Sequence, residues 1–234
     1  MNYDYDAYYM TDLKRGAHDT RDQGLCLMEL TALFAGERHT DNPVCVSPVL
    51  VEMGRELNDV LPDALRQELK PLVPSLPGTA GDGLDVARSY MALDWLIRTW
   101  LPAWLDLVPA TQEDARKLRE LDRIVDMSTA ERAGPVVREA QGSASAARLA
   151  AELAAELAAE LAAWSAAVST AWSAAWSAAV SAAESAAGSV ARSVARSVAR
   201  SVAVSDMNEV LAPTVAELQR SAIQLYADMI KSPH

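Results

Sequence analysis

The sequence predicts an all-α protein, and three observations support this. Stretches of alternating β-branched residues, which indicate strands, are almost absent from the 234 residues. Several segments instead carry apolar residues at helical spacing between helix-starting and helix-ending residues. Residues 148–205 repeat every four residues in an alanine-rich array, and alanine is the strongest helix former. We therefore expect a helical N-terminal domain, a long alanine-rich helix and a C-terminal helix that packs back.

The expected domain organisation follows from shifts in composition along the chain. The first segment is polar and rich in tyrosine, so we expect a mobile or loosely docked arm. A helical domain, the tetrapeptide-repeat helix and an amphipathic C-terminal helix with bulky apolar residues follow it. The predicted boundaries are residues 1–20 for the arm, 21–142 for the helical domain, 143–205 for the repeat helix and 206–234 for the C-terminal helix.

Each helix of the N-terminal domain has a local signal. Residues 24–36 predict a short buried helix that Gly36 ends. Ser47 as N-cap and Pro48 as the first helical residue begin the next helix. The glycine-rich residues 76–83 predict a linker.

The second half of the domain continues the pattern. A helix over 84–101 is kinked or ended by Pro102. The helix over 111–127 starts with Thr111 and Asp114 as a pair resembling a capping box. Pro213 makes a kink or a new start in the C-terminal helix. Further helices are expected near residues 62–69, from Ser128 or Thr129 toward Ala140, and over 207–231.

The array keeps one face apolar although its period is four residues. Each repeat advances about 40° around a helix, so one repeat position drifts around the whole surface. The variable residue is charged, then apolar, then charged again, which keeps charges on one side and apolar residues opposite. This pattern predicts an amphipathic helix about 90 Å long, or two helices broken near Gly188. The predicted interaction residues are Trp164, Val168, Trp172, Trp176 and Val180.

Three interpretations of the array stay open. It is passive sequence that arose by gene slippage, it packs onto its own N-terminal domain, or it forms a homo-oligomer or binds another protein. For the last, Glu152, Glu156 and Glu160 mirror Arg200, Arg196 and Arg192 about Trp176, so two antiparallel copies would bring opposite charges level. The uncharged stretch is long enough to cross a membrane, but its alanines, serines and mid-segment tryptophans predict no membrane span.

Composition restricts the remaining functions. The net charge of −11 and the isoelectric point near 4.7 argue against a nucleic-acid partner, because phosphate binding needs an excess of Lys and Arg. The start MNYDYDAYYM lacks the basic and apolar regions of a signal peptide. With two cysteines, we expect a cytoplasmic protein whose thiols are free or bind metal.

One cluster could carry chemistry. Cys26 and Glu29 are three residues apart on a predicted helix, and the loop after it carries His39 and Cys45. These four side chains could form a tetrahedral zinc site, although the spacing matches no compact zinc module. Alternatively, Cys26 is a reactive thiol paired with His39, or simply a small buried residue beside a solvated loop.

A resemblance marks the same region. The run CLMELTALFAGERHTDNPVCVSPV, residues 26–49, resembles a group of uncharacterised bacterial proteins common in actinobacteria. The run RSYMALDWLIRTWLPAWL, residues 88–105, is similar to the same group, whose members sometimes end in alanine-rich arrays. The resemblance implies no activity. It singles out the matching residues Cys26, Glu29, Glu37, His39, Asp41 and Cys45.

The leading functional prediction is a non-enzymatic helical scaffold or self-association protein that uses the array. No cofactor is expected for this function. The alternative is a metal-binding or thiol-dependent enzyme built from Cys26, His39 and Cys45, with zinc as its cofactor. No glycine-rich phosphate loop, HExxH motif or nucleophile elbow occurs in the sequence.

Overall fold

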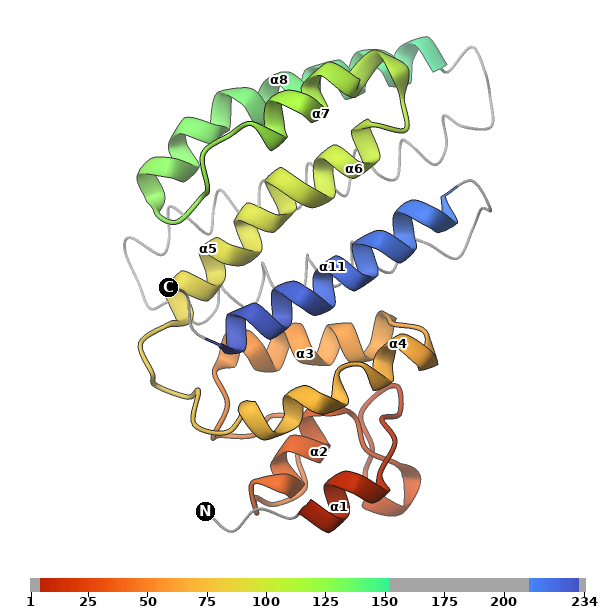
Figure 1. Ribbon diagram of the computed structural model, residues 1–234, viewed down its shortest axis with the longest axis vertical. Coiled ribbons are helices and arrows are strands. Elements are labelled where there is room, and N and C mark those ends of the chain that lie inside the picture. Colours follow the sequence, from red (N-terminus) through yellow and green to blue (C-terminus); the bar gives the residue numbers. More distant parts are fainter. Residues whose placement is uncertain (1–4, 152–210, 232–234) are drawn as a thin grey trace. The chain divides into compact units, whose positions relative to one another are not determined.

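The computed structural model describes residues 5–151 and 211–231, which fold into helices joined by turns (Figure 1). The all-α prediction is confirmed, because these two ranges contain no sheet and their one extended pairing is an isolated bridge between Leu13 and Leu25. No helix within the described ranges is long and apolar enough to cross a membrane.

The described residues form two compact units. Unit 1 contains residues 5–89 and 211–231, and unit 2 contains residues 90–151. The boundary falls inside residues 21–142, where the sequence predicted one domain. The array residues from 152 onward, including the predicted interaction residues Trp164, Val168, Trp172, Trp176 and Val180 and the predicted break at Gly188, lie outside the described part of the chain.

Unit 1 is built around α3, which contacts both α2 and α11 (Figure 1). Helix α1 and the 3-10 turns of η2 pack against α2. The elements of unit 1 are α1 (Tyr5–Met10), η1 (Arg21–Gln23), α2 (Leu27–Phe34), α3 (Pro48–Val60), α4 (Asp63–Gln67), η2 (Lys70–Ser75), the start of α5 (Asp85–Trp95) and α11 (Ala212–Ile230).

Local signals correctly predict where α2 ends and where α3 begins. Gly36 takes a left-handed φ of 76° after α2. Its amide donates to Leu33 O (3.0 Å) and the Glu37 amide donates to Ala32 O (2.8 Å), which is a Schellman motif. Helix α3 begins with Pro48 as predicted.

Ser47 takes the predicted N-cap position, but its hydroxyl binds a partner outside α3. Ser47 is the N-cap residue of α3, but its side chain makes no capping hydrogen bond. The hydroxyl donates to Asp85 Oδ1, because a carboxylate is a stronger acceptor than the neutral groups nearby. The Ser47 amide donates to Thr79 Oγ1 (2.9 Å), so the start of α3 is tied to the linker and to α5.

Unit 2 continues the helix of α5 through Pro102. A π-helical turn, η3, precedes the proline, and its wider backbone accommodates a residue that lacks an amide hydrogen. Pro102 therefore does not end the helix. The elements of unit 2 are the end of α5, η3 (Leu96–Trp100), α6 (Leu101–Leu105), η4 (Pro109–Thr111), α7 (Gln112–Arg119) and α8 (Met127–Ala151).

Two further cap predictions in unit 2 were wrong. The Thr111 hydroxyl donates to Leu105 O (2.7 Å) instead of capping α7. Asp126 directly precedes α8; its carboxylate accepts the Thr129 amide (2.8 Å), and its own amide donates to Thr129 Oγ1 (3.0 Å). This reciprocal pair takes the place of the predicted Ser128 or Thr129 cap.

Helix α11 is docked on α3 through a buried tyrosine. Tyr226 is fully buried, and its hydroxyl donates to Leu50 O (3.0 Å). Gly54, one turn further along α3, leaves room for the ring: a Cβ atom there would lie 2.4 Å from Tyr226 Oη. The absence of a side chain at Gly54 therefore makes this close approach of the two helices feasible.

A buried arginine holds the last turn of α11, close to Tyr226. The Arg88 side chain is fully buried, and its Nε donates to Met229 O (2.9 Å) in the last turn of α11. The guanidinium also binds both carboxylate oxygens of Asp82, at 2.9 and 2.6 Å. Carbonyls in the last turn have no partner within their own helix, so Arg88 satisfies one of them and complements the negative end of the helix dipole.

The contact between Gly54 and Tyr226 can be tested by a double-mutant cycle. Gly54→Ala should lower the free energy of unfolding by about 2 kcal/mol through overpacking, although alanine favours helix. Tyr226→Phe should cost about 1 kcal/mol through the lost hydrogen bond. The double variant should lose clearly less than the sum in urea denaturation, because the hydroxyl that clashes is gone.

Gly142→Ala in α8 is the matched control, since a Cβ there meets no atom within 4 Å. It should leave stability unchanged or raise it by up to about 1 kcal/mol. Strict additivity of the Gly54 and Tyr226 changes would contradict the packing described.

Candidate functional site

The predicted metal ligands Cys26 and Glu29 form the capping box of α2. Cys26 is the N-cap residue: its Sγ accepts the Glu29 amide (3.5 Å), and Glu29 Oε2 accepts the Cys26 amide (2.7 Å). The spacing of three residues, which suggested a shared metal-binding face, instead serves to satisfy the first amides of the helix. A cysteine here takes the position usually held by serine or threonine.

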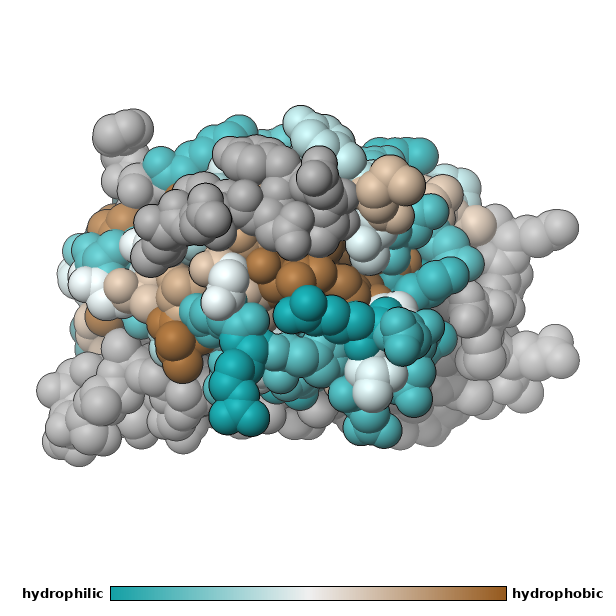
Figure 2. Space-filling view, turned by 90° about the horizontal axis from the view of Figure 1, so that it is seen from below, coloured by the Kyte–Doolittle hydropathy of each residue, from teal (hydrophilic) through white to brown (hydrophobic). Residues whose placement is uncertain are grey.

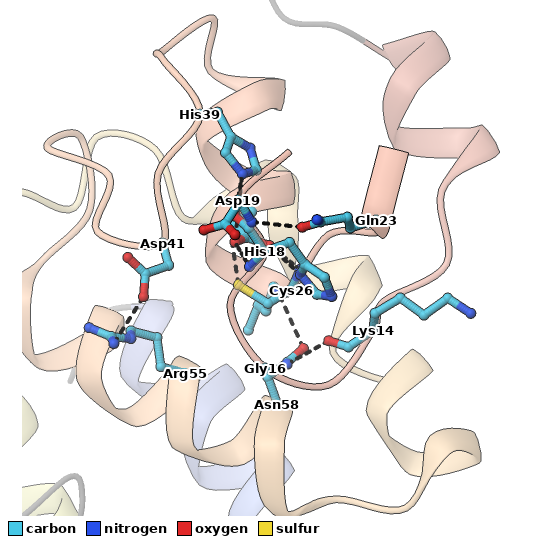
Figure 3. A network of polar contacts seen from close by, with 12 residues as sticks. Lys14, Gly16, His18, Asp19, Gln23, Cys26, His39, Asp41, Arg55 and Asn58 are labelled. Carbon is cyan, nitrogen blue, oxygen red and sulfur yellow. Dashed lines mark hydrogen bonds and ion pairs between the residues drawn. The ribbon is translucent and has the colours of Figure 1, made fainter. Parts of the chain in front are cut away.

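The Glu29 carboxylate is buried and is held by a histidine that the sequence analysis did not single out. The His18 amide donates to Glu29 Oε1 (2.6 Å), and His18 Nδ1 lies 2.8 Å from Glu29 Oε2. His39 Nε2 lies 3.8 Å from Glu29 Oε1 and donates to His18 O at 2.7 Å (Figure 3). The structure thus brings Cys26, Glu29 and His39 together, and adds His18.

These contacts determine how Glu29 ionises. Burial alone would raise its pKa, but the hydrogen bonds from the Cys26 and His18 amides and from the His18 ring outweigh that effect and lower the pKa. Glu29 is therefore a carboxylate at neutral pH, with both oxygens occupied by donors.

The same cluster fastens the segment before α2. Residues 13–18, assigned to a polar arm in the sequence analysis, are hydrogen bonded to α2, α3 and α4. Asn58 Nδ2 donates to Lys14 O (2.8 Å), and the Gly16 amide donates to Asp59 Oδ1 (2.8 Å). The oxygen of the same side-chain amide, Asn58 Oδ1, accepts the Leu27 amide at the start of α2 (3.1 Å). Polar side chains thus hold this segment as Figure 3 shows.

The remaining signature residues organise the loop between α2 and α3. The two Glu37 carboxylate oxygens accept the amides of Val44 and Cys45, each at 2.9 Å. Asp41 Oδ2 pairs with Arg55 Nη2 of α3 at 2.9 Å. Cys45 is thereby placed beside Glu37, and its carbonyl oxygen accepts amides of the linker.

The predicted zinc site gains no support from this arrangement. Within residues 5–151 and 211–231, no group of three or more His, Cys, Asp or Glu side chains is placed to hold a metal ion. The physical reason is visible at Glu29 and His39, whose facing atoms are already engaged by backbone groups. A metal site from Cys26, Glu29, His39 and Cys45 stays a prediction.

Neither thiol is activated as a nucleophile. Burial raises the pKa of the Cys26 thiol to about 12. Burial, together with the Glu37 carboxylate, raises the pKa of the Cys45 thiol to about 12 as well. Both thiols are free and protonated at neutral pH, whereas a catalytic cysteine needs a lowered pKa.

The surface in Figure 2 is a mixture of hydrophilic side chains and a smaller hydrophobic area. The most exposed large apolar side chains of unit 1 are Tyr9, Met10 and Val44. Single exposed apolar residues are normal on protein surfaces, so they do not define a binding site.

Comparisons with known proteins found no relative: no family model matches the chain, and neither the curated proteins nor the solved structures gave a significant match.

The structural role of Glu29 predicts a pH-dependent effect of Glu29→Gln. An amide cannot accept all the hydrogen bonds that the carboxylate accepts, so the variant should lose about 2 kcal/mol or more of unfolding free energy at pH 7. Because the pKa is lowered on folding, the carboxylate stabilises the fold above its ordinary value of 4.5. That contribution is lost as the pH falls from there through the folded-state pKa.

Urea denaturation between pH 7 and pH 3.5 measures this difference. The gap between wild type and Glu29→Gln should narrow below the ordinary carboxyl pKa. Glu68→Gln, at an exposed position, is the control and should change stability little at any pH. An equally large gap at every pH would contradict the ionisation of Glu29 described here.

Proposed function

We propose that the protein is a non-enzymatic helical scaffold that self-associates through its alanine-rich array. One observation carries this proposal: the array is attached to a folded helix at each end. Helix α8 extends to Ala151 on one side, and α11 begins at Ala212 on the other and is anchored by Arg88 and Tyr226.

Attachment at both ends supports a scaffold, because a segment fixed at two points has less conformational freedom than a tail fixed at one. A restrained segment loses less conformational entropy when it binds a partner, so its contacts yield more affinity. The residues proposed to make these contacts are Trp164, Val168, Trp172, Trp176 and Val180. Small residues between them allow close approach of a second helix, and the large side chains fill the gaps.

The alternative, a metal-dependent or thiol-dependent enzyme using Cys26, His39 and Cys45, is less well supported. Both thiols have raised pKa values, and Glu29 is fully used in holding α2 and His18. We also propose a cytoplasmic location, which the two free cysteines favour.

Replacing Trp164, Trp172 and Trp176 together by Glu tests the proposal. If these side chains lie at an interface, burying three charges in their place should weaken association by at least about 100-fold. Light scattering across a concentration series measures the change in mass.

The matched control adds the same charge on the predicted polar side of the array, as Ala163→Glu, Ala167→Glu and Ala174→Glu. This variant should keep the mass of the wild type. If the tryptophan variant also keeps its mass and thermal stability, the array is passive sequence and the proposed function is wrong.

A further inference from the structure

We propose that residues 14–24 form a strap that opens and closes while the rest of unit 1 stays folded, and that the closed strap blocks access to the polar atoms of Glu29 and His39. The strap lies entirely within the described part of unit 1. The inference goes beyond the proposed function and does not depend on the array, because every contact that carries it joins described residues of unit 1.

The two ends of the strap meet at an apolar base. Leu13 and Leu25, which flank the strap, form the isolated parallel bridge and are each 2% exposed. The Lys14 amide donates to Leu25 O (2.9 Å), and the side-chain amide of Gln67 bonds to both backbone groups of Leu13, each at 2.9 Å. A compact loop whose ends are joined in this way is an Ω-loop, and its base can persist when the loop itself detaches.

Above this base the strap contributes nothing to the apolar core. None of residues 14–24 is buried, although Gly16, His18 and Gly24 are partly covered. Burial of apolar side chains is the main source of folding stability, so the strap lacks the contacts that would tie its stability to the rest of unit 1. Segments with few buried apolar contacts open locally, at free energies below that of global unfolding.

Side chains of α2, of α3 and of the loop between them hold the strap through its backbone (Figure 3). The hydrogen bonds are Asn58 Nδ2 to Lys14 O (2.8 Å), the Gly16 amide to Asp59 Oδ1 (2.8 Å), the His18 amide to Glu29 Oε1 (2.6 Å) and His39 Nε2 to His18 O (2.7 Å). Each of these groups can bond to water once the strap opens. Each hydrogen bond therefore stabilises the closed form only by the difference between the protein partner and water.

The closed strap occupies the polar atoms of Glu29 and His39. Both the amide and the ring of His18 bind the Glu29 carboxylate, and the His18 carbonyl accepts His39 Nε2. Of its described donors, Glu29 keeps the Cys26 amide when the strap opens. Its Oε1 atom, which lies 3.8 Å from His39 Nε2, then becomes free together with that nitrogen. The strap thus determines whether these two side chains can bind another ligand.

Gly16 offers a way to change the closed strap alone. Its φ is 84°, in the left-handed region, and a Cβ atom there would meet no atom within 4 Å. Alanine at this position therefore strains the closed backbone without creating a clash. The open strap can leave this conformation, so the strain favours opening.

Native-state hydrogen exchange on the full chain tests whether the strap opens separately. The reporters are the Gly16 and His18 amides for the strap and the amide of Met53, which is buried in the middle of α3. The strap amides should have protection factors at least about 100-fold smaller than that of Met53, and low denaturant should leave them unchanged. Equal protection of all three amides, with the same dependence on denaturant, overturns the proposal.

Two variants separate the strap from the core. Gly16→Ala should lower the protection of the His18 amide roughly 10-fold through backbone strain. Gly54→Ala, which overpacks the contact with Tyr226, should lower the protection of Met53 and leave that of His18 unchanged. If Gly54→Ala lowers both by the same factor, the strap opens only with the whole of unit 1 and the proposal is wrong. The wild-type measurement decides the question if a variant fails to fold.

Acylation by diethyl pyrocarbonate, which attacks free imidazole nitrogens, tests access to His39. Because His39 Nε2 is bonded to His18 O in the closed form, its acylation should be slow in the wild type. The rate should rise roughly 10-fold in Gly16→Ala, as the opening does, and stay unchanged in Gly54→Ala. Peptide-resolved mass spectrometry measures the rate for each histidine. Acylation of His39 that is fast in the wild type and unaffected by Gly16→Ala overturns the blocking role of the strap.

Discussion

A guanidinium group removed from water must be surrounded by acceptors, and unit 1 depends on how Arg88 meets this requirement. Its acceptors come from three places in the chain: Asp82 in the linker, Asp85 in α5 and the Met229 carbonyl in α11. Ser47 extends the network to the start of α3 through Asp85. Breaking one partner of a buried charge is far more costly than losing an exposed ion pair, so these segments are held as one body.

A second buried charge, Glu29, also joins separate segments of unit 1, near the C-terminal end of α3. It joins the start of α2 to His18, while Asn58 joins α2 and α3 to the preceding segment. Arg88 is satisfied by the Asp82 and Asp85 carboxylates and the Met229 carbonyl, and Glu29 by the Cys26 and His18 amides and the His18 ring. They are structural groups: both carboxylate oxygens of Glu29 are engaged by donors, and the buried Cys26 thiol beside it stays protonated at neutral pH.

The features predicted correctly are those whose cause is local. Gly36 ends α2 through its own positive φ, and Pro48 starts α3 because it needs no amide partner. The hydroxyl roles of Ser47 and Thr111 could not be predicted, since their acceptors, Asp85 and Leu105, are brought near only by folding.

At the candidate site the spacing of Cys26 and Glu29 is equally that of a capping box. The same spacing also places two metal ligands on one helix face, and cysteine is an unusual N-cap residue, so the sequence alone does not distinguish the two roles. His18 gave no periodic or motif signal at all. It reaches Glu29 only because residues 13–18 are held against α2, α3 and α4.

The central claim is that α11, reached only after the whole array, belongs to the core of unit 1. Native-state hydrogen exchange across denaturant concentrations tests it most directly. Buried amides of α11 around Tyr226 and of α3 around Leu50 should open with the same free energy, as one cooperative unit. Protection of α3 with nearly free exchange throughout α11 would contradict the account.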